Sequence, residues 1–255
     1  MKAIFEGRTD QLEYKVFNNR EGMGAYSASV AAKKILDVLK EKEEVRIIFA
    51  SAPSQNEFMK HLTAVEEIDW SRVVGFHMDE YIGLPEDSDQ WFKNYIESHL
   101  FAKVSMKMFH FIDGTKDPEA MIEEYGLLLA ENPIDLVCLG VGENGHIAFN
   151  DPPVADFDDP FPIKKVELDQ FSRQQQVNDG CFETLEKVPT HALTLTIPTL
   201  LRGDMMVCTV PGATKRSAIK KVLNDPISTD CPATILRTHG NAYLVMDKGA
   251  YGDFQ

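Results

Sequence analysis

The sequence lacks long apolar runs and has few cysteines. No stretch approaches the roughly 18 consecutive apolar residues that a membrane-spanning helix needs. The four cysteines, Cys138, Cys181, Cys208 and Cys231, lie far apart and form no CxxC motif. This spacing is typical of buried free thiols and not of a disulfide framework. Residues 1–10 also lack a secretory pattern, so we expect a cytoplasmic protein without membrane attachment.

Basic residues are in deficit as well. Only 26 Lys and Arg stand against 40 Asp and Glu, which gives a formal net charge of −14. Such a charge disfavours a nucleic-acid-binding surface, so we expect no nucleic acid partner. It also means that an anionic ligand would need a locally built positive site. Each lysine or arginine beside a glycine turn is therefore of interest.

What the sequence does contain is an alternation of strand-like and helix-like stretches. Strands are expected at residues 11–17, 45–50, 72–77, 106–111, 134–139, 191–197, 205–210 and 242–247. Helices are expected at residues 23–40, 56–65, 90–101, 117–130 and 214–223. Residues 152–190, rich in proline and acidic residues, interrupt this rhythm, and we expect a long connection that can cover the site.

The alternation predicts an α/β fold with an open, mostly parallel, Rossmann-like sheet and helices on both faces. The chain has no internal repeat, low-complexity tract or clear linker. Its length fits one α/β domain, so we expect a single domain over residues 1–255. The sequence leaves both a monomer and a homo-oligomer open.

The most informative stretch is GVGENGHIAFNDPP at residues 140–153. It follows the buried strand expected at 134–139, and its three glycines permit a sharp turn with backbone N–H groups open to an anion. The same stretch carries one histidine, one amide and two carboxylates, namely His146, Asn144, Glu143 and Asp151. A histidine beside carboxylates can move protons near neutral pH. The simpler interpretation is a glycine turn with a surface histidine.

Two other strand ends carry groups that can bind an anion or transfer a proton. Ser51 and Ser54 lie in a turn that opens a helix, where they can bind a phosphate or merely cap the helix. Asp79 and Glu80 follow another strand among apolar neighbours, and partial burial would raise a carboxyl pKa toward general-base duty. Because ligands collect at the carboxyl ends of parallel strands, we expect these groups to meet.

The fourth strand end is the turn PGATKR at residues 211–216. Lys215 lies in the first turn of the helix expected there, where the helix dipole disfavours a cation. A lysine in that place makes most sense if it contacts an anion.

The segments MDEYIGL, GVGENGHIAFND and VPGATK resemble the glucosamine-6-phosphate deaminase (isomerase) family, sister to the 6-phosphogluconolactonases. The run that follows His146, IAFN, is similar to the deaminases. The resemblance implies a Rossmann-like α/β sheet, no metal and no organic cofactor. It also implies the conversion of glucosamine 6-phosphate and water into fructose 6-phosphate and ammonia.

The resemblance assigns roles to particular residues. Asp79 would be the base that takes the C2 proton and returns it at C1. His146 would open the pyranose ring, with Asp151 holding its imidazole in the working tautomer. Lys215 and the 51–54 turn would bind the phosphate, and Gly142 would lie against the substrate.

Several residues depart from the family pattern. Asn144 stands where many deaminases have Asp, and Asp151 is one methylene shorter than the usual Glu. In the phosphate turn Ala52 replaces a glycine. The arginine that usually joins the lysine on the phosphate aligns near Gly180, and we expect Arg173 to replace it from the same segment.

Three functions remain open on these observations. The first is aldose–ketose isomerisation with deamination of an amino-sugar phosphate. The second is a lactonase-type hydrolase in which His146 activates water. The third is a catalytically reduced sugar-phosphate-binding protein, which the altered phosphate turn favours.

Overall fold

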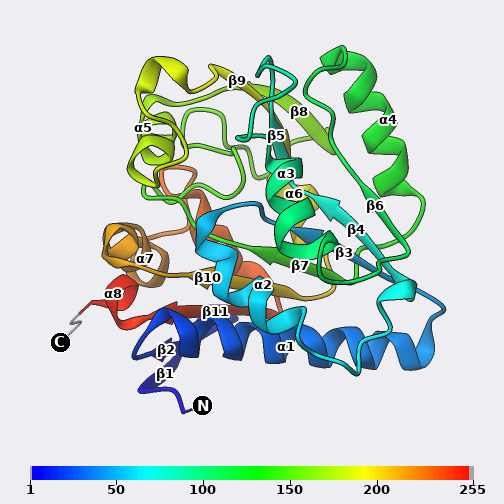
Figure 1. The fold of residues 1–255 in the computed structure, drawn as a ribbon. Coiled ribbons are helices and arrows are strands. Elements are labelled where there is room, and N and C mark those ends of the chain that lie inside the picture. Colours follow the sequence, from blue (N-terminus) through cyan, green and yellow to red (C-terminus); the bar gives the residue numbers. More distant parts are fainter. Residues whose placement is uncertain (1, 253–255) are drawn as a thin grey trace.

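The computed structural model describes residues 2–252. The main sheet contains β1 (Phe5–Thr9), β2 (Leu12–Phe17), β3 (Val45–Phe49), β4 (Val73–His77), β6 (Met108–His110), β7 (Leu136–Leu139), β10 (Met206–Val210) and β11 (Ala242–Asp247). Its strand order is β1-β2-β11-β10-β7-β3-β4-β6, and every neighbouring pair is parallel except the edge hairpin β1–β2. The expected open, mostly parallel sheet is therefore confirmed (Figure 1).

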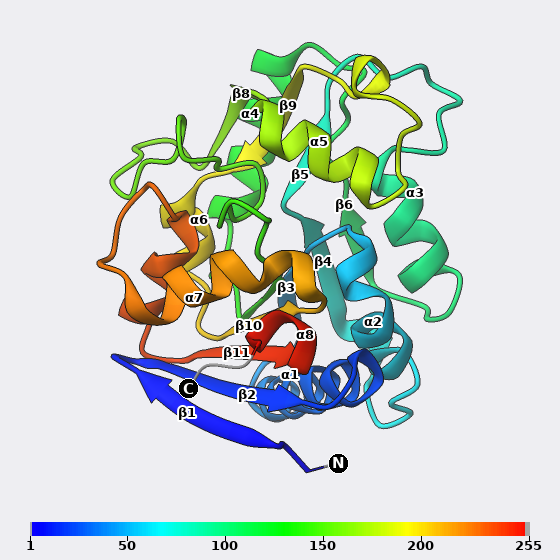
Figure 2. The ribbon, with the colours of Figure 1, turned by 90° about the vertical axis from the view of Figure 1, so that its left-hand side faces the viewer.

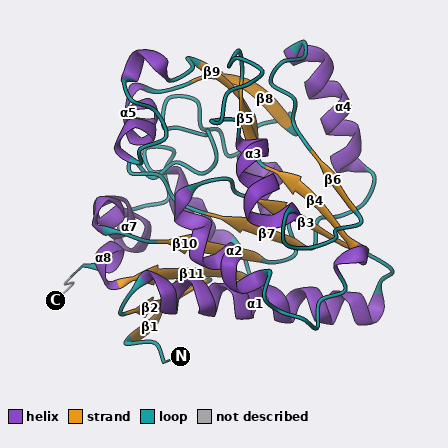
Figure 3. Ribbon diagram, viewed as in Figure 1, coloured by secondary structure: helices purple, strands orange, loops and turns teal. Residues whose placement is uncertain are grey.

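Helices cover both faces of this sheet (Figure 3). They are α1 (Arg20–Glu41), α2 (Asn56–Leu62), α3 (Phe92–Ile96), α4 (Pro118–Ala130), α5 (Gln170–Asn178), α6 (Ile197–Leu201), α7 (Arg216–Asn224) and α8 (Lys248–Tyr251). In β3, Ile47 and Phe49 pack with α1 and α2, whereas Ile48 belongs to the core formed with α4, α6 and α7. This two-sided burial explains why the strands are continuous apolar runs. Within residues 2–252, no helix combines the length and apolar character of a membrane span.

A second, three-stranded sheet corrects two expectations. It consists of β5 (Asp79–Tyr81), β9 (His191–Leu195) and β8 (Ile163–Glu167), in that order and all antiparallel. Residues 152–190 are thus not a plain connection, because they contain both β8 and α5. The strand expected at 191–197 belongs to this sheet and not to the parallel one. In Figure 1 the second sheet and α5 lie above the main sheet.

The order of the main strands creates a switch point. From β3 the chain continues outward to β4 and β6, whereas from β7 it goes to the other side, to β10 and β11. Neighbouring strands β3 and β7 therefore send their following turns in opposite directions, which opens a crevice at their carboxyl ends. The segments singled out in the sequence follow β3, β4, β7 and β10, around this crevice.

Candidate active site

One pocket collects residues from all four strand ends. Its volume is about 240 Å³, which is somewhat below the roughly 300–1,000 Å³ typical of small-molecule sites. The predicted site residues that line it are Ser51, Ala52, Ser54, Asp79, Gly142, His146 and Lys215. The four strand ends selected in the sequence therefore meet in one pocket.

His146 and Asp151 form a close pair, as the family resemblance implies. Nδ1 of His146 lies 3.0 Å from Oδ1 of Asp151, and both side chains are buried. Burial opposes ionisation of Asp151, but the charge of His146 and the surrounding hydrogen bonds outweigh it and lower the pKa of the carboxyl. A carboxylate held against Nδ1 fixes the ring, with Nε2 left for chemistry.

Asn144 supports this pair from the same turn. Its Nδ2 donates to Oδ1 of Asp151 at 2.8 Å, and its Oδ1 accepts from the backbone N–H of His146 at 3.0 Å. An asparagine can make both hydrogen bonds because its amide has a donor and an acceptor. An aspartate could accept from His146 but has no donor for Asp151. The role open to Asn144 is to position its neighbours.

The glycines let the histidine fold back on the turn. The imidazole of His146 lies over Gly142 so closely that a Cβ there would come within 2.3 Å of three ring atoms. Gly145 has φ +90°, and a Cβ on it would lie 2.4 Å from Sγ of Cys231. Both positions therefore require glycine.

Helix α5 contributes residues that no sequence motif singles out. The hydroxyl of Ser172 lies 2.8 Å from Nδ1 of His146 and also bonds to Asp151. Gln175 accepts from the backbone N–H of Glu143 at 2.8 Å, and Gln175, Gln176 and Asp179 line the pocket. In Figure 2, α5 lies above both α7 and α2. The segment expected to cover the site does so, but as a helix.

Asp79 and Glu80 have separate tasks. Asp79 lines the pocket, and burial, together with the charge of Glu80, raises the pKa of its carboxyl well above the usual value. Glu80 turns away and accepts from the backbone N–H groups of Tyr81, Phe92 and Lys93 at 2.9 to 3.0 Å. Burial still raises the pKa of Glu80 to about 7. Asp79 is thus the carboxyl available to a ligand.

Lys215 and Ser51 are polar groups buried in the pocket wall. Lys215 is 5% exposed, and its side-chain amine has no hydrogen-bond or ion-pair partner among the described residues. Burial lowers the pKa of its amine, although the charges of Asp179 and Glu143 act in the other direction. The Ser51 hydroxyl likewise has no partner within residues 2–252. Both groups are suited to contact an anionic ligand.

The structure does not bring Arg173 into the pocket, which corrects the expectation that it replaces the missing arginine. Its guanidinium donates to the backbone carbonyls of Leu185 and Val188 at 2.7 and 3.0 Å and so joins α5 to the segment at 185–188. A different arginine, Arg20, lines the pocket instead. Arg20 lies far upstream of the glycine-rich turn and has no motif of its own.

No metal centre stands out in the described part of the chain. Within residues 2–252, no group of three or more His, Cys, Asp or Glu side chains is arranged to hold a metal ion. The pocket itself is lined by carboxyl groups, an imidazole and cationic side chains.

Known proteins resemble this chain over most of its length. A glucosamine-6-phosphate deaminase of Bacillus cereus is 34% identical over 226 residues, 88% of this chain and 83% of the relative. The corresponding protein of Lactobacillus delbrueckii subsp. bulgaricus is 32% identical over 228 residues, 88% of this chain and 95% of the relative.

Solved structures agree. A monomeric glucosamine-6-phosphate deaminase superposes with a TM-score of 0.83 at 25% identity, over 94% of this chain and 98% of that one. A 6-phosphogluconolactonase from Thermotoga maritima shares the fold, with a TM-score of 0.74 at 21% identity over 93% and 100% of the two chains. The family model for glucosamine-6-phosphate isomerases/6-phosphogluconolactonase matches residues 18–160. The chain therefore belongs to this family of sugar-phosphate enzymes.

Proposed function

We propose that this protein converts glucosamine 6-phosphate and water into fructose 6-phosphate and ammonia. The observation that carries the proposal is that Asp79 and His146 line a single pocket, with Asp151 lying behind His146 at 3.0 Å from its Nδ1. Two separate proton-handling groups suit a reaction with two separate proton transfers. The relatives that are 32–34% identical are named for the same activity.

Each group takes one part of the reaction. His146 moves a proton between the ring oxygen and the anomeric hydroxyl, which opens the pyranose. Asp79 then takes the C2 proton while the aldehyde oxygen takes a proton from the substrate's own ammonium group, which gives an enolamine. Asp79 returns its proton to C1, which leaves a protonated imine at C2. Water adds to that imine, and ammonia leaves to give fructose 6-phosphate. Asn144 and Ser172 hold the His146–Asp151 pair in place.

Lactone hydrolysis would leave Asp79 without a chemical role in this pocket. Hydrolysis of a lactone needs one base to activate water, a task for His146, and leaves no proton for Asp79 to take from carbon. The burial that raises the pKa of Asp79 strengthens it as a base toward a weakly acidic C–H bond. We therefore favour isomerisation with deamination over lactone hydrolysis. We also favour an active enzyme over a catalytically reduced binding protein.

We also propose a cytoplasmic location. Cys138, Cys208 and Cys231 are free and buried, and Cys181 is free and partly buried. Free thiols suit a reducing compartment.

Lys215 is expected to bind the phosphate of the substrate. Losing a charge-assisted hydrogen bond costs on the order of 1.5–3 kcal/mol, about ten- to a hundredfold in affinity. Calorimetry of Lys215→Ala should show that loss for D-glucitol 6-phosphate and almost no change for D-glucitol. Lys220→Ala, which removes an exposed lysine of α7, the helix that follows Lys215, is the matched control. Equal binding of the two hexitols by the native protein would contradict a phosphate site.

A further inference from the structure

We propose that Arg20, held in place by Glu57, is the second cation of the phosphate site and fills the role expected for Arg173. The inference rests on the proposed function, because it takes the ligand to be a sugar phosphate. Arg20 is the first residue of α1, and it lines the same pocket as Ser51 and Lys215.

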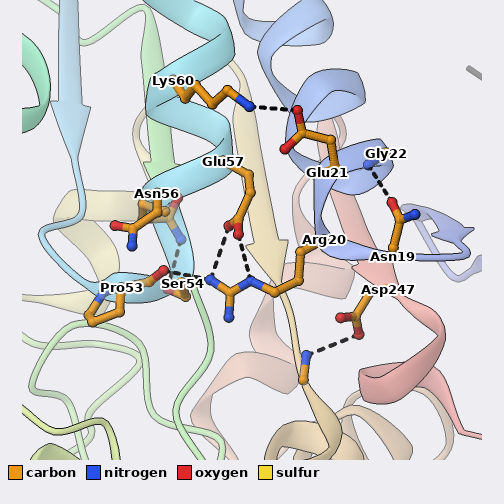
Figure 4. Close-up of polar contacts among 12 residues, drawn as sticks. Asn19, Arg20, Glu21, Gly22, Pro53, Ser54, Asn56, Glu57, Lys60 and Asp247 are labelled. Atoms are coloured by element: carbon orange, nitrogen blue, oxygen red, sulfur yellow. Dashed lines mark hydrogen bonds and ion pairs between the residues drawn. The ribbon is translucent and has the colours of Figure 1, made fainter.

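The guanidinium of Arg20 is fixed on two sides. Its Nε and Nη2 donate to the two carboxylate oxygens of Glu57 at 2.9 and 3.0 Å, and Nη2 also donates to the carbonyl of Pro53 at 2.7 Å. Figure 4 shows that the remaining terminal nitrogen points away from both partners. Nη1 has no hydrogen-bond partner among the described residues. The guanidinium of Arg20 is therefore fixed through Nε and Nη2 and keeps Nη1 as a free donor.

The anchor places this donor beside the phosphate turn. Pro53 belongs to the turn between β3 and α2, and Glu57 lies in the first turn of α2. Pro53 itself lines the pocket next to Ser51 and Ser54. Arg20 is thus tied to the segment in which the hydroxyls for an anion were expected.

The charge of Lys215 alone does not balance the charge of a phosphate. The chain carries a net charge of −14, and the two acidic groups that act on Lys215, Asp179 and Glu143, offset its single charge. Lys215 alone therefore leaves a doubly charged phosphate incompletely neutralised. A guanidinium adds a second charge and directional N–H donors that match phosphate oxygens.

Both cations also lie at helix ends that disfavour them. Arg20 occupies the first turn of α1, and Lys215 directly precedes α7, so each faces the positive end of a helix dipole. An anion between them relieves both clashes. The Arg20–Glu57 pair adds little stability itself, since the side chains are 42% and 21% exposed. Its effect is to aim the guanidinium.

The test compares three variants by calorimetry with D-glucitol 6-phosphate and D-glucitol as probes. Arg20→Ala should weaken the phosphorylated probe about ten- to a hundredfold and leave the other almost unchanged. Arg20→Lys should recover only part of the affinity, because an ammonium cannot keep both the Glu57 fork and the phosphate. Lys60→Ala is the control, since Lys60 pairs with Glu21 beside the same helix end and lies outside the pocket.

The outcomes separate this inference from the proposed function. If Arg20→Ala binds D-glucitol 6-phosphate like the native protein while Lys215→Ala loses affinity, the phosphate site stands and the role of Arg20 is overturned. An equal loss in Arg20→Ala and Lys60→Ala would also overturn it, because general charge would then explain the effect. If the native protein does not distinguish the two hexitols, both the inference and the proposed function fail. Thermal unfolding of each variant verifies that the fold is retained.

Discussion

Asp79→Asn should abolish the exchange of the C2 proton of glucosamine 6-phosphate with solvent deuterium. The amide cannot take up a proton at neutral pH, so the step assigned to Asp79 has no base. The variant should still fold, because burial already disfavours the charged carboxylate and asparagine has nearly the same shape. Exchange is measured by proton NMR in deuterated buffer.

The binding of D-glucitol 6-phosphate separates chemistry from binding. Its Kd should stay within about tenfold of the native value, because the variant removes a reacting group and leaves the phosphate contacts in place. Asp87→Asn, an exposed aspartate in the loop after β5, is the control and should exchange like the native protein. Undiminished exchange in Asp79→Asn would refute the assignment of the base.

The pH profile offers a second test of Asp79. Burial and the charge of Glu80 raise the pKa of this carboxyl, and a base must be deprotonated to act. Activity should therefore fall as the pH drops through the raised pKa, so that the acid limb of kcat/KM lies above the ordinary aspartate value of about 4. An acid limb at or below that value would show that Asp79 titrates as an exposed carboxyl does.

Asp151→Asn is the variant with the second large expected effect. An uncharged side chain no longer stabilises the protonated imidazole of His146, with which Asp151 shares a 3.0 Å contact. Ring opening by His146 should then slow by about 10²- to 10⁴-fold, the usual contribution of acid–base catalysis. The measurement is turnover of glucosamine 6-phosphate, whose ring must open before isomerisation.

An open-chain analogue without the C5 oxygen is the matched substrate. It bypasses pyranose opening, so Asp151→Asn should lose far less activity with it than with the cyclic substrate. Asp151 is 1% exposed, and a damaged fold would lower both rates together. Equal losses on the two substrates would assign Asp151 a purely structural role.

The main sheet and the four strand ends can be predicted from the sequence because the signal for each strand lies within the strand itself. Strands such as β3 and β7 are buried on both faces, so they appear as short apolar runs that need no knowledge of their partners. The polar groups that follow those runs meet because parallel strands end at one edge. Asp79, His146 and Lys215 can therefore be selected together from the order of residues along the chain.

What the sequence does not reveal depends on contacts between distant segments. Helix α5 buries the polar residues Ser172, Gln175 and Gln176 toward the site, so apolar periodicity cannot detect it. The apolar run of β9 resembles a strand of the main sheet, but its pairing with β5 and β8 is decided by tertiary structure.

Arginine placement shows the same limit. Arg173 lies in the segment where the family's arginine was expected, but its nearest acceptors are the carbonyls of Leu185 and Val188. Arg20 lies 33 and 37 residues from its partners Pro53 and Glu57, and no local pattern links them. Only the folded chain shows which guanidinium reaches the pocket.

The most direct measurement is the release of ammonia from glucosamine 6-phosphate by the purified native protein, with fructose 6-phosphate identified as the second product. The proposed function predicts equal amounts of both products and their loss in Asp79→Asn. Hydrolysis of 6-phosphogluconolactone without ammonia release from the amino sugar would contradict it, as would binding of glucosamine 6-phosphate without turnover.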